Sequence, residues 1–157
     1  MEREKVKQIL IFCRDVDGEI KHNTKMIQDY EDTYYTRDTP GGDENSGFKS
    51  KNKISNPTAQ TALNVPDYVR GEIRALHELN IQLGALKAAI LHELNVLPLH
   101  QKTILYEFYI KGSQWVQITG RVNYSATQCK KLRNRGLEIL AQKFNGNDLI
   151  KNFNYPS

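Results

Sequence analysis

The sequence predicts an all-α protein in which long helical segments precede a domain of three shorter helices. Two observations lead to this fold class. Over residues 2–34 and 65–97, apolar residues recur at intervals of three and four, which is the period of an amphipathic helix. After Pro98 come three shorter helical stretches, separated by glycine and by Asn-Tyr-Ser, and no stretch alternates as a strand would.

The first long helix, over residues 2–34, defines the N-terminal segment 1–34. Its apolar stripe consists of Val16, Ile20, Ile27, Tyr30 and Tyr34. The opposite face carries charges of both signs, as an exposed face does. Gly18 weakens a helix by about 1 kcal/mol relative to alanine, which leaves a break at this residue open.

A flexible loop or linker is expected over residues 35–56, which lack periodicity and are rich in glycine, serine, lysine and asparagine. Asn56-Pro57 has the residue types of a helix start. A short helix over Thr58–Leu63 should therefore open the next segment, 57–97.

The rest of segment 57–97 is a long leucine-rich helix that begins after Val65-Pro66. Its apolar residues are Val69, Ile73, Leu76, Leu79, Leu83, Leu86, Ile90, Leu94 and Leu97. A stripe of this length exceeds what a small C-terminal domain covers, so it should pack on the N-terminal helix, on a second copy of the chain, or on both. The residues expected at an oligomer interface are Ile73, Leu76, Leu83, Leu86 and Ile90.

Basic residues gather in the C-terminal part of the chain. Residues 98–144 contain eight lysines and arginines against two glutamates, a formal charge of +6 in a chain whose total is +4. The rest of the chain therefore carries −2. This separation of charge indicates a polyanionic partner for residues 98–144, and it favours nucleic acid.

Three short helices are expected within segment 98–144. Gly112 ends the first, because glycine suits the left-handed position after a helix. Ser113 caps the second helix and Ser125 caps the third, which reaches about Phe144. The inward faces of the second and third helices are Trp115, Val116, Ile118, Val122, Cys129, Leu132, Gly136, Ile139 and Leu140.

The second helix, a tight turn at Asn123-Tyr124 and the basic third helix have the pattern of a helix-turn-helix. In that motif the last helix presents short or polar side chains to base edges in the major groove. The predicted base contacts are Ala126, Thr127, Gln128 and Lys131. The predicted phosphate contacts are Ser125, Arg121, Lys130, Arg133, Asn134 and Arg135. The residues alone leave one alternative, a solvated basic face on an ordinary three-helix bundle.

The stretch 97–144 resembles the promoter-binding fourth region of bacterial sigma factors, a tri-helical helix-turn-helix. The matching residues are Leu97-Pro98, Ile104-Leu105-Tyr106, Trp115-Val116-Gln117-Ile118, Tyr124-Ser125-Ala126-Thr127-Gln128 and Leu137-Glu138-Ile139-Leu140. The chain departs from that pattern at Ala126 and Thr127, where a basic residue is usual, at Thr119 for alanine and at Asn123 for glycine. The sequence specificity of sigma factors is therefore not carried over.

Nearly the whole chain resembles the phage late-gene transcription activators of the RinA/ArpU kind. The shared order is a charged N-terminal helix, a Gly/Lys/Asn loop, the stretch Lys53-Ile54-Ser55-Asn56-Pro57-Thr58, a leucine-rich helix and the domain above. The resemblance implies a phage or prophage regulator that binds double-stranded DNA upstream of packaging and structural genes. It also implies that host RNA polymerase is a partner. An autonomous sigma factor is not expected, because the large promoter-melting region is missing.

Two other functions were weighed. A small DNA-packaging subunit of the terminase type would also bind DNA and form an oligomer, although such subunits place the DNA-binding motif first. A nuclease would use Asp15, Asp17, Asp29 and Asp32 around a metal, but charge runs on a helix are usually solvated faces. We therefore expect no enzymatic activity, no catalytic residue and no cofactor.

The remaining sequence features favour a protein of the bacterial cytoplasm. Cys13 and Cys129 are far apart in the chain, and the histidines have no metal-like spacing with them or with each other. No apolar run is long enough for a membrane span, and the N-terminus lacks the apolar core of a signal peptide. The tail 145–157 is expected to be frayed.

Overall fold

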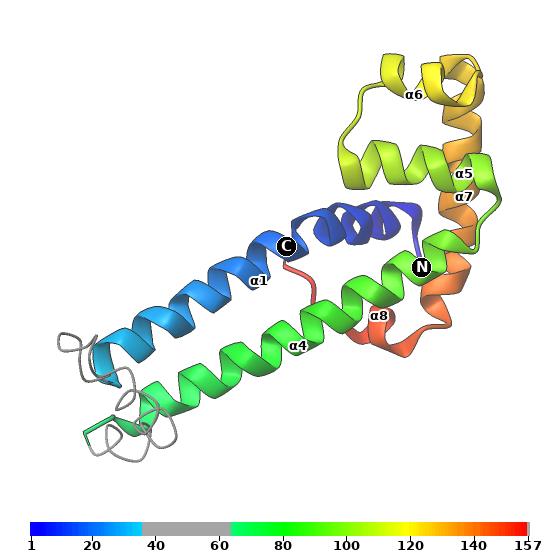
Figure 1. The fold of residues 1–157 in the computed structure, drawn as a ribbon. Helices are drawn as coiled ribbons and strands as arrows, with labels where there is room; N and C mark the ends of the chain where they lie inside the picture. The colour runs from blue at the N-terminus through cyan, green and yellow to red at the C-terminus, as the bar shows by residue number, and fades with distance from the viewer. Residues whose placement is uncertain (36–63, 157) are drawn as a thin grey trace. The chain divides into compact units, whose positions relative to one another are not determined.

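The computed structural model describes residues 1–35 and 64–156 (Figure 1). These residues are helical without strands, which confirms the all-α prediction. Nearly all of the loop predicted at 35–56, and the short helix predicted at 58–63, lie outside them. The chain forms two compact units: the first unit is Met1–Gly18 with Gln82–Ser157, and the second unit is Glu19–Ile81.

The two long helices are α1 (Arg3–Tyr34) and α4 (Asp67–Asn95), and each contributes to both units. Helix α1 continues through Gly18, so the break that the glycine left open does not occur. In the first unit, one apolar cluster joins α1 to α4. Its members from these helices are Val6, Ile9, Leu10, Cys13, Leu86, Ile90 and Leu94. The leucine-rich stripe thus packs on the N-terminal helix of its own chain, which was one of the predicted outcomes.

This packing corrects the oligomer interface. Leu83, Leu86 and Ile90 are 3%, 0% and 0% exposed, so they have no surface left for a second copy. Ile73 and Leu76, in the second unit, are only partly buried. The sequence stripe on α1 was also incomplete, because it began at Val16 and omitted the buried residues nearer the N-terminus.

In the second unit, α1 and α4 are joined by polar groups. The side-chain amide of buried Asn23 donates to Asn80 Oδ1 at 3.0 Å, and the Asn80 amide donates to Thr24 Oγ1 at 3.3 Å. The Thr24 hydroxyl in turn donates to the carbonyl of Ile20 at 2.8 Å. A buried asparagine that must find a partner across a helix pair favours one register over others, and these bonds satisfy it in the observed register.

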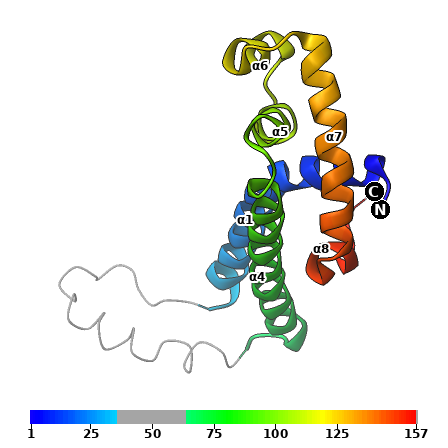
Figure 2. The ribbon, with the colours of Figure 1, turned by 90° about the vertical axis from the view of Figure 1, so that its right-hand side faces the viewer.

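Three further helices follow in the first unit. Helix α5 (Leu99–Leu105) continues without interruption into the π-helical segment η2 (Tyr106–Lys111), and α6 (Trp115–Val122) and α7 (Ala126–Asn145) come next. Helix α5 lies across α7, and α6 lies beside the start of α7 (Figures 1 and 2). Gly112 has φ 76° after η2, as its predicted role requires.

The main core cluster of the first unit includes residues from both sides of the boundary predicted between segments 57–97 and 98–144. Leu105, Leu137, Leu140 and Phe144 belong to the same cluster as the residues of α1 and α4 described above. A smaller cluster, made of Ile104, Ile118, Val122 and Cys129, fixes α6 against α5 and α7. Val116 was predicted to face inward, but it is 79% exposed, because the inward side of α6 is filled by Ile118 and Val122.

The tail is also ordered, contrary to the sequence prediction. Helix α8 (Asp148–Asn152) follows α7, and its Ile150 is fully buried in the main cluster. The Tyr155 hydroxyl donates to the carbonyl of Ile150 at 2.8 Å, and the Tyr155 ring meets that of Phe12 edge-on at 5.5 Å. The tail therefore docks onto the first turns of α1, because apolar groups there would otherwise face water.

Gly136 permits the close contact between α5 and α7. A Cβ atom at this position would lie 2.8 Å from Leu105 Cδ1 and 3.5 Å from the Cβ of Gln101. We expect Gly136→Val to lower the free energy of unfolding by about 1–3 kcal/mol, because the packed core must shift to admit the side chain. Urea denaturation measures this change.

The matched control is Gly120→Ala in α6, where a Cβ meets no atom within 4 Å. Alanine favours a helix over glycine by about 1 kcal/mol, so this variant should be as stable as the parent or more stable. Equal stability of Gly136→Val and the parent protein would contradict the packing role of Gly136.

Candidate nucleic-acid interface

The start of α7 has the local structure that the sequence predicted. Asn123 ends α6 in the left-handed conformation, with φ 59° and ψ 35°. Ser125 is the N-cap of α7, and its Oγ accepts a hydrogen bond from the backbone N–H of Gln128 at 3.1 Å. The Cys129 thiol donates to the carbonyl of Tyr124 at 3.9 Å, so buried Cys129 also fixes the turn. The turn residues and the cap together fix the direction in which α7 begins.

Helix α7 presents one continuous polar face. Gln128, Lys131 and Arg135 are exposed, and their spacing of three and four residues places them on the same side of the helix. Thr127 is exposed beside them, and Ala126 is exposed at the first helical position. Cys129, Gly136, Leu137 and Leu140 are buried on the other side. The predicted base-contact residues therefore lie together on the accessible face of α7.

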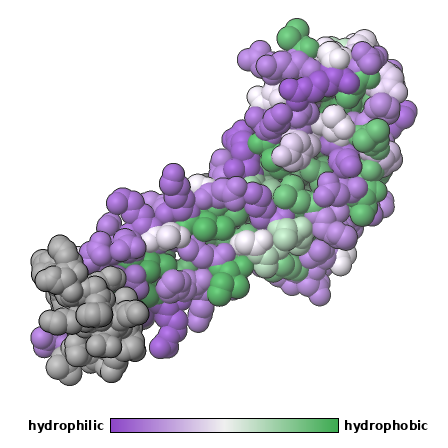
Figure 3. All heavy atoms as spheres, in the orientation of Figure 1, coloured by the Kyte–Doolittle hydropathy of each residue, from purple (hydrophilic) through white to green (hydrophobic). Residues whose placement is uncertain are grey.

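Four cations of α7 have no acidic partner in the part of the chain that the structure describes. Among the described residues, Lys130, Lys131, Arg133 and Arg135 form no ion pair with a carboxylate. Uncompensated cations on one helix create a positive potential that attracts a polyanion. Over α5 and α6, the face shown in Figure 3 is mainly hydrophilic, with isolated hydrophobic residues.

Arg133 and Lys130 lie on a different side of α7, against aromatic rings. The guanidinium of Arg133 is 5.5 Å from the ring centre of Trp115 and 5.7 Å from that of Phe108. These two rings stack at 4.7 Å, and Lys130 Nζ is 5.9 Å from the Trp115 ring. Each such contact contributes about 0.5–1 kcal/mol at an exposed site.

Two of the predicted phosphate contacts, Arg133 and Asn134, have partners within the protein. Arg133 is partly buried over the rings, and its Nε donates to Asn134 Oδ1 at 3.3 Å, so both side chains are engaged within the protein. Lys130 is exposed and keeps its ammonium group accessible. Arg135 and Ser125 are exposed as well. The phosphate candidates that the structure leaves accessible on α7 and its cap are therefore Ser125, Lys130 and Arg135.

Arg121, the phosphate candidate on α6, forms an ion pair with buried Glu107 of η2. Lys111 Nζ lies 3.5 Å from the same carboxylate, and the Ser113 hydroxyl donates to it at 3.2 Å. The charge of Arg121 is therefore compensated inside the protein. Glu107 entered the prediction only through the net charge, although an acid among the apolar residues Ile104, Leu105 and Phe108 is a signal of a buried ion pair.

The start of α6 differs from the prediction in one detail. Gln114, rather than Ser113, is the N-cap, and its backbone N–H donates to Gln117 Oε1 at 3.0 Å. The hydroxyl of Ser113 is used by Glu107 instead. Gln117 Oε1 thus accepts from the N-cap backbone N–H, as the third residue of a helix does in a capping box.

Both cysteine thiols are packed side chains. Cys13 is 1% exposed, and burial raises the pKa of its thiol to about 11. Burial also raises the pKa of the Cys129 thiol. Raised pKa values keep both groups in the protonated, unreactive form at neutral pH, so neither has the properties of a nucleophile.

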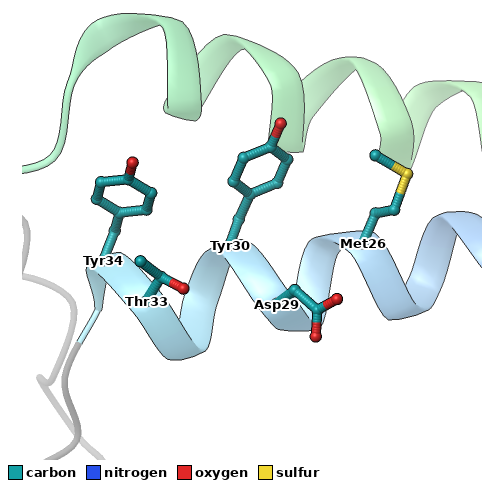
Figure 4. A pocket seen from close by; sticks show the side chains of 5 residues that line it. All are labelled: Met26, Asp29, Tyr30, Thr33 and Tyr34. Carbon is teal, nitrogen blue, oxygen red and sulfur yellow. The ribbon is translucent and has the colours of Figure 1, made fainter.

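The second unit contains a small pocket beside α1, lined by Met26, Asp29, Tyr30, Thr33 and Tyr34 (Figure 4). Met26, Tyr30 and Tyr34 point toward α4, whereas Asp29 and Thr33 point away from it. Asp29 lies 3.9 Å from Lys25, and a hydrogen bond with Tyr68 raises the pKa of Tyr34. These groups do not form an acid–base pair or a ligand set, so the pocket has no chemistry that we assign.

The described residues contain neither a metal-ligand cluster nor a membrane-spanning helix. No three histidine, cysteine, aspartate or glutamate side chains within 1–35 and 64–156 lie close enough together to share a metal ion. Over the same residues, no helix has the length and hydropathy needed to cross a membrane.

Comparison with known proteins assigns this chain to no family. No protein-family model, curated protein or solved structure matches this sequence or fold.

Proposed function

We propose that this chain is a sequence-specific DNA-binding transcription activator, and that α7 is its recognition helix. The observation that carries the proposal is the accessible face of α7, where Gln128, Lys131 and Arg135 are exposed on one side of the helix and the two cations pair with no carboxylate of the described part of the chain. The major groove of double-stranded DNA admits an α-helix, and glutamine and lysine have the hydrogen-bonding groups that read adenine and guanine there.

The neighbouring residues support the same use of α7. In this proposal α6 is the first helix of a helix-turn-helix, the residues around Asn123 are the turn, and α7, which Ser125 caps, is the second helix. Ser125 and Lys130 are exposed at the start of α7, and in this proposal they contact the phosphate backbone beside the groove. In this proposal Thr127, Gln128 and Lys131 read bases, while Ser125, Lys130 and Arg135 hold phosphates.

The biological role is proposed from the resemblance to phage late-gene activators of the RinA/ArpU kind. In that role, the protein binds upstream of packaging and structural genes and recruits or assists host RNA polymerase. The alternative of a small packaging subunit requires a stable oligomer. The burial of Leu83, Leu86 and Ile90 within one chain removes the interface first expected for such an oligomer.

The proposal is tested by selection from a library of random DNA duplexes. The full chain is immobilised, retained duplexes are sequenced, and the enriched site is placed upstream of a promoter for transcription with purified bacterial RNA polymerase. We expect one enriched motif and more transcript when the protein is added. Retention without any shared sequence would contradict specific recognition, and bound DNA without a change in transcript would contradict the activator role.

Oligomeric state separates the two DNA-binding functions. Mass measurement in solution on the full chain, with and without the selected duplex, should show no closed ring. A stable ring of many subunits would favour the packaging function over the proposed activator.

A further inference from the structure

Glu107 is the only buried charged side chain among the described residues, and it lies at the base of the proposed DNA-binding helices. Its side chain is 7% exposed, while that of its partner Arg121 is 48% exposed. The carboxylate also accepts a hydrogen bond from Ser113, and the carbonyl of Glu107 accepts one from the Ser113 N–H at 2.8 Å. Glu107 is thus bonded to the segment before α6 and to the last turn of α6.

The ion pair places Arg121 in competition between two anions. Arg121 is on the outer side of α6, the helix that crosses the DNA backbone in a helix-turn-helix. A phosphate at that position would be surrounded by water and salt, which weaken its attraction for a cation. The Glu107 carboxylate has little contact with water, so its attraction for the guanidinium is stronger, and removing the cation would leave the buried charge with only Lys111 and Ser113 as partners.

We infer that Glu107 withholds Arg121 from the DNA backbone and thereby lowers the sequence-independent part of DNA binding. Glu107 then tunes the affinity for DNA although it touches no DNA. The inference rests on the proposed function, because it presupposes that α6 and α7 lie on a duplex. Each phosphate contact adds to binding at every sequence, so withholding one cation lowers the affinity for DNA of any sequence and makes binding less dependent on salt.

The test is the salt dependence of binding to a fluorescein-labelled duplex of arbitrary sequence, followed by anisotropy. Each phosphate contact contributes about 0.9 to the slope of log K against log salt. We expect Glu107→Gln to steepen the slope by about 0.9 and to raise the affinity roughly eightfold at about 0.1 M salt. Glutamine keeps the shape of the side chain and an oxygen for Ser113, but it loses the charge that holds Arg121.

Arg121→Gln, made in both backgrounds, gives the decisive comparison. With Glu107 present, removal of Arg121 should leave the slope unchanged. In the Glu107→Gln background, it should lower the slope by about 0.9, back to the parent value. A merely structural role of Glu107 would not move the slope in this pattern, and a role of the freed Lys111 would leave the double variant as steep as Glu107→Gln.

Two outcomes overturn the inference alone. One is a lower slope of log K against log salt for Arg121→Gln when Glu107 is in place. This measurement does not require that a Glu107 variant folds. The other is an equal slope for the parent and Glu107→Gln when both are folded by circular dichroism. Arg135→Gln serves as the control for the proposed function, because it should lower the slope in every background. A parent protein that binds no duplex would overturn the proposed function instead of this inference.

Discussion

Replacing Lys131 and Arg135 together by alanine is expected to weaken binding to the selected duplex by roughly a hundredfold. Both side chains are exposed on the face of α7 that we propose enters the major groove. One good base contact contributes about 1–3 kcal/mol of discrimination, and a change of about 1.4 kcal/mol is tenfold in affinity. The thermal midpoint of unfolding should stay the same, because neither side chain is packed. Fluorescence anisotropy and circular dichroism measure the two quantities.

The control removes the same charge from elsewhere. Lys21 and Lys25 are exposed on the part of α1 that belongs to the second unit, so the Lys21→Ala/Lys25→Ala variant has the same net charge as the double variant of α7. We expect this control to bind the duplex within a few-fold of the parent. A loss as large as that of the α7 variant would mean that total charge, rather than a recognition face, determines binding.

The second large effect is expected in the tail, at Ile150. This side chain is fully buried in the main core cluster, so Ile150→Ala should lower the free energy of unfolding by about 2–5 kcal/mol. The neighbouring Leu149 is 41% exposed, and Leu149→Ala should change that free energy by no more than about 0.5 kcal/mol. Urea denaturation followed by the fluorescence of Trp115, the only tryptophan, reports on the unit that contains both residues.

The comparison between the two alanine variants tests tail docking directly. If both variants were as stable as the parent, residues 148–155 would not be part of the folded core. If both variants were equally destabilised, the side of α8 that faces the core would differ from the one observed, because α8 buries Ile150 and exposes Leu149.

The local features of this protein could be predicted from its sequence. The spacing of Leu86, Ile90 and Leu94 indicates a helix wherever that segment lies, because the period depends only on backbone geometry. Gly112, Asn123 and Ser125 ended or capped their helices as expected, since each acts on groups within a few residues of itself. The exposed face of α7 follows from the same period.

The tertiary structure decided which of these residues are free to act. Arg121 and Lys131 are equivalent cations in the sequence, but only the fold brings buried Glu107 beside Arg121, whereas Lys131 is exposed and forms no ion pair within residues 1–35 and 64–156. Likewise, the fold places Arg133 over the ring of Trp115. It also buries Ile150 and Leu86 in the core of a single chain. The physical reason is the same in each case: burial and ion pairing depend on groups far apart in sequence, whereas helix period and capping depend on near neighbours. The sequence by itself thus determined the helices and the basic character of residues 98–144, and the tertiary structure decided which charges face outward.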